Sequence, residues 1–213
     1  MVWFVPVIAA AAVVAVGGKL IYDKVNKPNQ KSIPKPKDVI FLDGETGVGK
    51  DTILEILVNA KFKEEYIATS KPKTTHFDYN SNSIDIWNIS GGEGKSNLIL
   101  NNKERTKLAE RKQQGASVHY VYVFNADEYF DKKQELIKRR INTAMEFASS
   151  ENFDFKIIGT HRDKAQKHEA EMDSLMNEFR QNYGSECEIW DLTRAKENGE
   201  QVKNELIDFI FKG

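Results

Sequence analysis

The sequence predicts a doubly wound α/β domain with a mostly parallel sheet and one antiparallel edge strand, preceded by a transmembrane helix. Three observations support this prediction. Strand and helix patterns alternate from Asp38 onward, two early apolar runs are joined by a short turn, and residues 1–18 carry no side-chain charge. An early hairpin followed by strand–helix units is typical of doubly wound sheets.

Six short apolar runs are the expected strands. The first, VIFL, is continuous, which is typical of a parallel strand buried on both faces. The second and third are separated by Asn80-Ser81-Asn82, a turn-forming trio that predicts an antiparallel hairpin. The fourth, HYVYVF, is again continuous. The expected strands cover residues 39–42, 74–79, 83–89, 119–124, 155–158 and 188–192.

Five segments between these strands have helical patterns. The first begins directly after a glycine-rich turn. The third places apolar residues at i, i+4 and i+8, and the fourth gathers Met, Leu and Phe side chains on one face. The expected helices cover residues 51–59, 104–114, 132–149, 165–183 and 199–211.

Composition excludes some partners. The 213-residue chain has 31 basic and 32 acidic side chains, so no global field favours nucleic acid or an acidic partner. We therefore expect no nucleic-acid binding. The single cysteine, Cys187, cannot form an internal disulfide, which fits a reducing compartment. The four histidines are scattered and form no metal-binding cluster with cysteine.

Residues 1–22 are expected to form a retained transmembrane anchor. About 20 apolar residues span a bilayer as a helix, so residues 2–22 are just long enough. Trp3 and Tyr22 are suited to the two interfaces. A cleavable signal peptide is the alternative, but no positive side chain precedes the apolar run.

Residues 23–37, DKVNKPNQKSIPKPK, form a polar linker with three prolines. Lysines follow the apolar segment and no basic side chain precedes it. The positive-inside rule therefore places the domain of residues 38–213 in the cytoplasm, as part of a single-pass membrane protein.

The segment GETGVGKDT at residues 44–52 is the most informative motif in the chain. It matches the phosphate-binding pattern G-x-x-x-x-G-K between an apolar strand and a helix start. In that setting backbone N–H groups and the helix N-terminus bind phosphate, and the lysine neutralises it. The expected nucleotide-binding residues here are Gly44, Glu45, Thr46, Gly47, Val48, Gly49, Lys50, Asp51 and Thr52.

Asp51 occupies the position at which this pattern has Ser or Thr. The usual hydroxyl ligates Mg²⁺, and a carboxylate can do so too because this ion prefers hard oxygen ligands. The added negative charge lies beside the expected phosphates, so nucleotide affinity or metal dependence is expected to be unusual.

Residues 83–93, SIDIWNISGGE, resemble the third strand and switch II of Ras-like small GTPases, in a form similar to the Arf and signal-recognition-particle-receptor β branch. The resemblance implies that Asn88 stands at the position of the metal-orienting Asp. It also implies that Gly91 contacts the γ-phosphate and that Gly92 replaces the water-positioning Gln. Asp51 and Asn88 would then be an exchange, in which hydroxyl plus carboxylate has become carboxylate plus amide.

The segment IIGTHRD at residues 157–163 resembles the N-K-x-D base-recognition motif of this family. The resemblance implies Thr160 in place of Asn, His161 in place of Lys, and Asp163 as the acceptor for guanine N1–H and its exocyclic amine. Adenine has an acceptor at N1, so a carboxylate there discriminates against it.

The segment DLTRAK at residues 191–196 resembles the S-A-K loop, in which Thr193 and Arg194 would support the base. The family also has a switch I threonine that closes over Mg²⁺. Thr75 is the expected residue and Thr74 the alternative. The expected metal ligands are Asp51, Thr75 and Asn88, and the expected catalytic residues are Lys50, Thr75 and Gly91.

The resemblance covers residues 38–213 and implies a membrane-anchored, GTP- or GDP-binding switch protein that uses Mg²⁺ and a protein effector or activating partner. Weak GTP hydrolysis is expected, because Gly92 has no side chain to orient water.

Two other classes stay open. A P-loop kinase for small molecules would need an arginine-rich lid, and the only adjacent arginine pair, Arg139-Arg140, lies in an expected helix. A nucleotide-binding scaffold without turnover could recruit a partner to the membrane. Nucleotide selectivity separates the first class from a GTPase, and single-turnover hydrolysis separates the second.

Overall fold

The computed structural model describes residues 37–64, 72–89, 91 and 95–212. Six strands form one sheet in the order β2-β3-β1-β4-β5-β6, and all neighbouring pairs are parallel except β2 with β3. The expected α/β class with one antiparallel edge strand is thus confirmed. The strands are β1 (Asp38–Gly44), β2 (Lys73–Tyr79), β3 (Asn82–Asn88), β4 (Val118–Asn125), β5 (Asp154–Thr160) and β6 (Glu186–Ile189).

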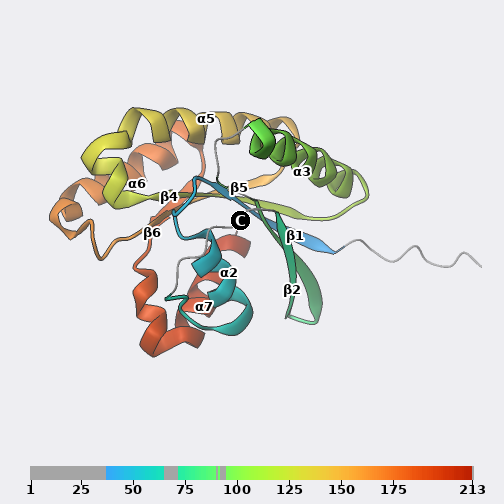
Figure 1. The fold of residues 1–213 in the computed structure, drawn as a ribbon, viewed down its shortest axis with the longest axis horizontal. Helices are drawn as coiled ribbons and strands as arrows, with labels where there is room; N and C mark the ends of the chain where they lie inside the picture. The colour runs from blue at the N-terminus through green and yellow to red at the C-terminus, as the bar shows by residue number, and fades with distance from the viewer. Residues whose placement is uncertain (1–36, 65–71, 90, 92–94, 213) are drawn as a thin grey trace, which may run out of the picture. The chain divides into compact units, whose positions relative to one another are not determined.

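Helices cover both faces of the sheet (Figure 1). One face carries α3 (Lys95–Gln113), α5 (Gln134–Ser150) and α6 (Glu169–Tyr183), and the other carries α2 (Lys50–Asn59) and α7 (Ala195–Phe211). Four short turns complete the described part of the chain: α4 (Ala126–Glu128), the π-turn η1 (Tyr129–Lys133), η2 (Gln166–His168) and η3 (Leu192–Arg194).

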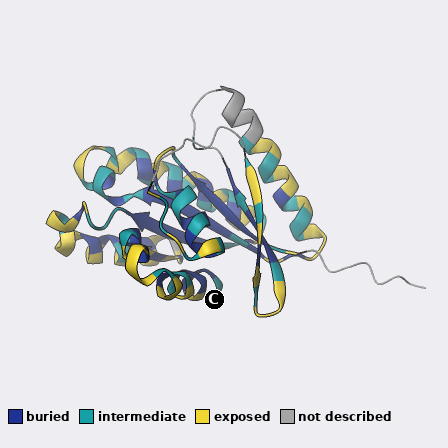
Figure 2. Cartoon of the chain, turned by 60° about the horizontal axis from the view of Figure 1, so that its bottom comes forward, coloured by how far each residue is buried: buried dark blue, intermediate teal, exposed yellow. Residues whose placement is uncertain are grey.

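The central strands separate two apolar clusters, one under each helical layer. Successive side chains of a strand point to opposite faces. Val39 and Phe41 of β1 therefore belong to the cluster under α3, α5 and α6, whereas Ile40 and Leu42 belong to the cluster under α2 and α7. Figure 2 shows this buried centre, with the exposed residues on the outer helical surfaces and on the edge strand β2.

Several expected boundaries were wrong, and a local contact explains one of them. The strand expected at residues 188–192 ends at Ile189, because the Asp191 side chain accepts the Thr193 backbone N–H and begins η3. The helix expected at 199–211 begins earlier, at Ala195, and continues through a non-helical residue at Asn198. The helix expected at 104–114 is α3, which begins earlier, at Lys95. The helix expected at 165–183 is divided into η2 and α6.

No helix in the described part of the chain is long and apolar enough to cross a membrane. The expected anchor at residues 1–22, and all of the expected linker except Lys37, lie outside the described residues. The transmembrane helix therefore stays a prediction from the sequence.

Candidate functional site

A cavity of about 290 Å³ opens where β1, β5 and β6 end. These strands run parallel in one sheet, so the segments that follow them meet at the same edge, which is where doubly wound folds bind ligands. The predicted site residues that line this cavity are Thr46, Gly47, Gly49, Lys50, Asp51, Thr52, Gly91, Thr160, His161, Asp163 and Thr193.

Residues 44–50, here named the glycine turn, connect β1 to α2 and need glycine at two positions. Gly44 has φ 141°, and a Cβ there would lie 2.1 Å from the backbone oxygen of Val123. Gly49 has φ 94° and precedes α2. Glycine adopts such angles without the steric cost that other residues incur. The turn can therefore present its backbone and the α2 N-terminus to the cavity, an arrangement suited to an anion.

Gly44→Ala is expected to destabilise the fold by about 3 kcal/mol or more, because the new Cβ combines backbone strain with a clash against Val123. Gly115→Ala is the matched control, because Gly115 has φ 96° but a Cβ there would meet open space. That control should lose about 1 kcal/mol. Urea unfolding of both variants measures the difference, and equal losses would contradict a requirement set by Val123.

Lys50 lies inside the glycine turn and is only 6% exposed. Its Nζ donates to the backbone oxygens of Gly44 at 2.8 Å and Glu45 at 2.6 Å. Burial lowers the pKa of Lys50 to about 8, although Asp43 and Asp51 act in the opposite direction. The ammonium group is thus held where it can neutralise a phosphate bound by the same turn.

Asp51 and Asn88, the two positions of the expected exchange, are in direct contact. Asn88 Nδ2 donates to Asp51 Oδ1 at 2.5 Å, and Lys63 Nζ lies 3.9 Å from Asp51 Oδ2. Asn88 is 1% exposed, and its Oδ1 has no hydrogen-bond partner within the described ranges. No group of three or more His, Cys, Asp or Glu residues in those ranges could hold a metal ion.

The loop after β5 is tied to the glycine turn through Thr160, which is fully buried. Its hydroxyl lies 2.7 Å from the backbone oxygen of Val48 and 3.1 Å from that of Phe124. His161 has φ 60°, places Nδ1 2.8 Å from the same hydroxyl, and has its pKa lowered by burial. Asp163, two residues later, is thereby held at the cavity wall.

The structure places the two residues predicted to support the base at different cavities. Thr193 lines the cavity, and its backbone N–H and hydroxyl contact Asp191 Oδ1 at 2.9 and 2.5 Å. Arg194 instead pairs with Glu205 at 3.1 Å and lines a different cavity. Thr193 therefore shares the first cavity with most of the predicted residues, whereas Arg194 shares the second cavity with Asp163, which lines both.

The structure does not bring Thr75 to the cavity. Thr75 lies within β2 opposite Ile86, and neither it nor Thr74 is among the cavity-lining residues. Gly44, Glu45 and Val48 belong to the glycine turn but do not line the cavity either. Gly92 lies outside the described residues.

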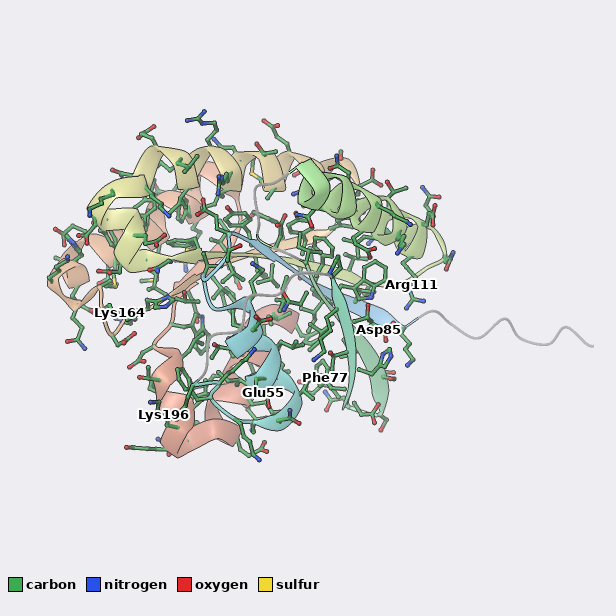
Figure 3. The ribbon with its side chains drawn as sticks, viewed as in Figure 1. Glu55, Phe77, Asp85, Arg111, Lys164 and Lys196 are labelled. Atoms are coloured by element: carbon green, nitrogen blue, oxygen red, sulfur yellow. The ribbon has the colours of Figure 1, made fainter. Side chains whose placement is uncertain are left out.

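Sequence reasoning missed several lining residues, among them Phe62, Lys63 and Lys164. Phe62 follows α2, and Lys196 Nζ at the start of α7 lies 5.0 Å from its ring centroid. Figure 3 labels Lys164 on the loop after β5 and Lys196 on α7. The available signal was an aromatic residue between Lys61 and Lys63 in an otherwise polar stretch.

Comparison with known proteins adds no assignment for this site: the chain matches no protein-family model, and no curated protein shows significant similarity to it.

Proposed function

We propose that this chain is a P-loop, Ras-like guanine-nucleotide-binding protein with an N-terminal membrane anchor. One observation carries the proposal: the same cavity joins the glycine turn around buried Lys50 to the loop that holds Asp163. The first suits the phosphates of a nucleotide and the second suits a guanine base. Together they favour a guanine nucleotide over a simple anion.

Mg²⁺ is the metal that such a nucleotide would bring, and Asp51 with Asn88 fits it by donor type. Asp51 offers a carboxylate, Oδ1 of Asn88 is a second hard oxygen without a partner among the described residues, and Mg²⁺ prefers oxygen ligands. The ion would neutralise charge on the phosphate oxygens. Neither Thr75 nor Asn88 lines the cavity, but Asn88 contacts Asp51, which does, so the proposed metal site depends on Asp51 and Asn88.

Asp51→Ser is expected to weaken Mg²⁺-dependent GDP binding about tenfold, because it leaves Asn88 without a carboxylate partner. The double change Asp51→Ser with Asn88→Asp should recover binding, since it restores a hydroxyl and a carboxylate. GDP titrations of the unmodified chain, Asp51→Ser, Asn88→Asp and the double variant, with and without Mg²⁺, measure this coupling. A double variant no better than the single ones would show that the two positions do not act together through the metal.

Turnover is proposed to be slow. Intrinsic rates of Ras-type GTP hydrolysis are of order 10⁻⁴ s⁻¹ even with the water-positioning Gln, and the sequence has Gly92 at the corresponding position. A partner would have to supply the missing group. Single-turnover hydrolysis much faster than this would contradict the proposal.

The decisive experiment is to identify the nucleotide that copurifies with the full-length chain. Denaturing the purified protein and separating the released nucleotide by ion-exchange chromatography should give GDP or GTP. Adenine nucleotide would favour the kinase alternative, and a protein that neither carries nor binds any nucleotide would reject the proposal.

The anchor is tested separately by fractionation. The full chain should remain in the membrane pellet after a high-salt or carbonate wash, because residues 2–22 are long enough to span the bilayer. The matched control, a chain lacking residues 1–22, should be soluble. Recovery of a processed, secreted form would support the signal-peptide alternative instead.

A further inference from the structure

The glycine turn carries a carboxylate next to the proposed phosphate position. Glu45 directly follows Gly44, and its side chain is 15% exposed. A carboxylate near bound phosphates repels them, and the repulsion is stronger where little water screens it. A nucleotide site built on this turn therefore needs a way to offset the charge of Glu45.

Two cations from the neighbouring helical layer form ion pairs with the carboxylate of Glu45. Arg140 of α5 forms an ion pair with Glu45 through its Nη1, and Lys133 of η1 places Nζ 3.5 Å from Glu45 Oε2. Lys133 also lies 2.9 Å from Glu128, so its charge is shared. Asp43 also acts on the charge of Arg140, but Arg140 approaches Glu45 more closely than Lys133 does, so Arg140 is the main counter-charge of Glu45 in the described part of the chain.

The backbone of Glu45 is bound to the rest of the site. Its carbonyl oxygen accepts the Nζ of Lys50 at 2.6 Å, and Gly91 packs so closely that a Cβ there would lie 2.2 Å from the Glu45 carbonyl carbon. The next residue, Thr46, donates its backbone N–H to Gly91 at 3.2 Å. A charge change at the Glu45 side chain thus occurs one residue away from the cavity-lining atoms.

We propose that Arg140, assisted by Lys133, is a positioning residue that neutralises Glu45 and thereby sets the affinity of the site for nucleotide phosphates. It acts through Glu45 and need not touch the nucleotide. This inference rests on the proposed guanine-nucleotide function. It requires that removing Arg140 penalise ligands in proportion to their negative charge.

The test is a double-mutant cycle in the full-length chain with Arg140→Ala, Glu45→Gln and the double variant. Affinities for GTP, GDP and guanosine are measured by competition with a fluorescent GDP analogue. Arg140→Ala should weaken GDP binding about tenfold, GTP binding more, and guanosine binding less than twofold. Glu45→Gln alone should bind GTP at least as tightly as the unmodified chain. The double variant should return to within about threefold of the unmodified chain.

Arg139→Ala is the matched control, because it removes the same charge one residue earlier on α5 from an exposed side chain. It should leave all three affinities unchanged. An equal loss for guanosine and GTP would mean that Arg140 acts only on the fold, and a double variant as weak as Arg140→Ala would mean that Arg140 binds phosphate directly. Either result overturns this inference but leaves the proposed guanine-nucleotide function standing. If Arg140→Ala does not fold, a Glu45→Gln chain that binds GTP more weakly overturns it. An unmodified chain that binds no guanine nucleotide rejects the proposed function, and this inference with it.

Discussion

Replacing Lys50 with alanine is expected to weaken GDP binding by at least tenfold, about 1.4 kcal/mol or more. The ammonium group is held inside the glycine turn by two backbone carbonyls, and no other lysine is buried in that turn. Its removal takes the positive charge away from the proposed phosphate position. Fluorescence titration with a GDP analogue measures the loss.

The pH dependence gives a second readout for the same residue. Burial places the pKa of Lys50 at about 8 in the folded chain, and a bound phosphate would raise it. Binding above pH 8 must therefore take up a proton, so the affinity should fall as pH rises above about 8, by up to tenfold per pH unit. Lys50→Ala should abolish this dependence.

The Lys50 prediction has a matched control variant and one outcome that would contradict it. Lys103→Ala removes an exposed lysine from α3 and should leave the affinity and its pH profile unchanged. Equal GDP affinities in the unmodified chain and in Lys50→Ala would remove the P-loop interpretation of the glycine turn.

The sheet could be predicted because its elements depend on local patterns. The hairpin is an example: Asn80 and Ser81 both have positive φ, and Asn is among the residues that adopt this region most readily. The turn therefore fixes which strand is antiparallel. The continuous apolar runs likewise predicted strands at β1 and β4, and both lie in the middle of the sheet.

Elements without a local pattern were missed. The first half of α3 includes Asn101 and Asn102, which are poor helix formers, and the expected helix therefore began too late. The π-turn η1 has no periodic signal and is continuous with α5. Such segments depend on packing, which the sequence alone does not display.

The candidate site likewise contains features that the sequence predicted and features that it did not. Its glycine turn and Asp163 follow strands with recognisable motifs, so their residues could be named before their positions were known. The ion pair between Glu45 and Arg140 joins positions far apart in the chain, and no spacing predicts it. Thr75 is the opposite case, because the resemblance named it as a site residue but the structure places it away from the cavity.

Asp163→Asn is expected to weaken GDP binding by about a hundredfold or more, roughly 2.8 kcal/mol, and to shift preference toward xanthine nucleotides. The carboxylate of Asp163 would accept the two adjacent donors of guanine, whereas an amide can donate to the carbonyl that xanthine has in place of the exocyclic amine. Because Asp163 lines the cavity on the loop fixed by Thr160, the change should alter the base contact without moving the glycine turn.

Competition among GTP, XTP and ATP in the unmodified chain and in Asp163→Asn measures this shift in preference. Lys164→Ala is the matched control, because Lys164 is the next residue, lines the same cavity and is exposed. It should leave the order of preference unchanged, since a lysine offers no acceptor to guanine. A shift toward xanthine in Asp163→Asn alone would assign base recognition to the carboxylate. An Asp163→Asn chain that still prefers GTP by the original margin would show that Asp163 does not recognise guanine. An unmodified chain that prefers ATP would favour the kinase alternative instead.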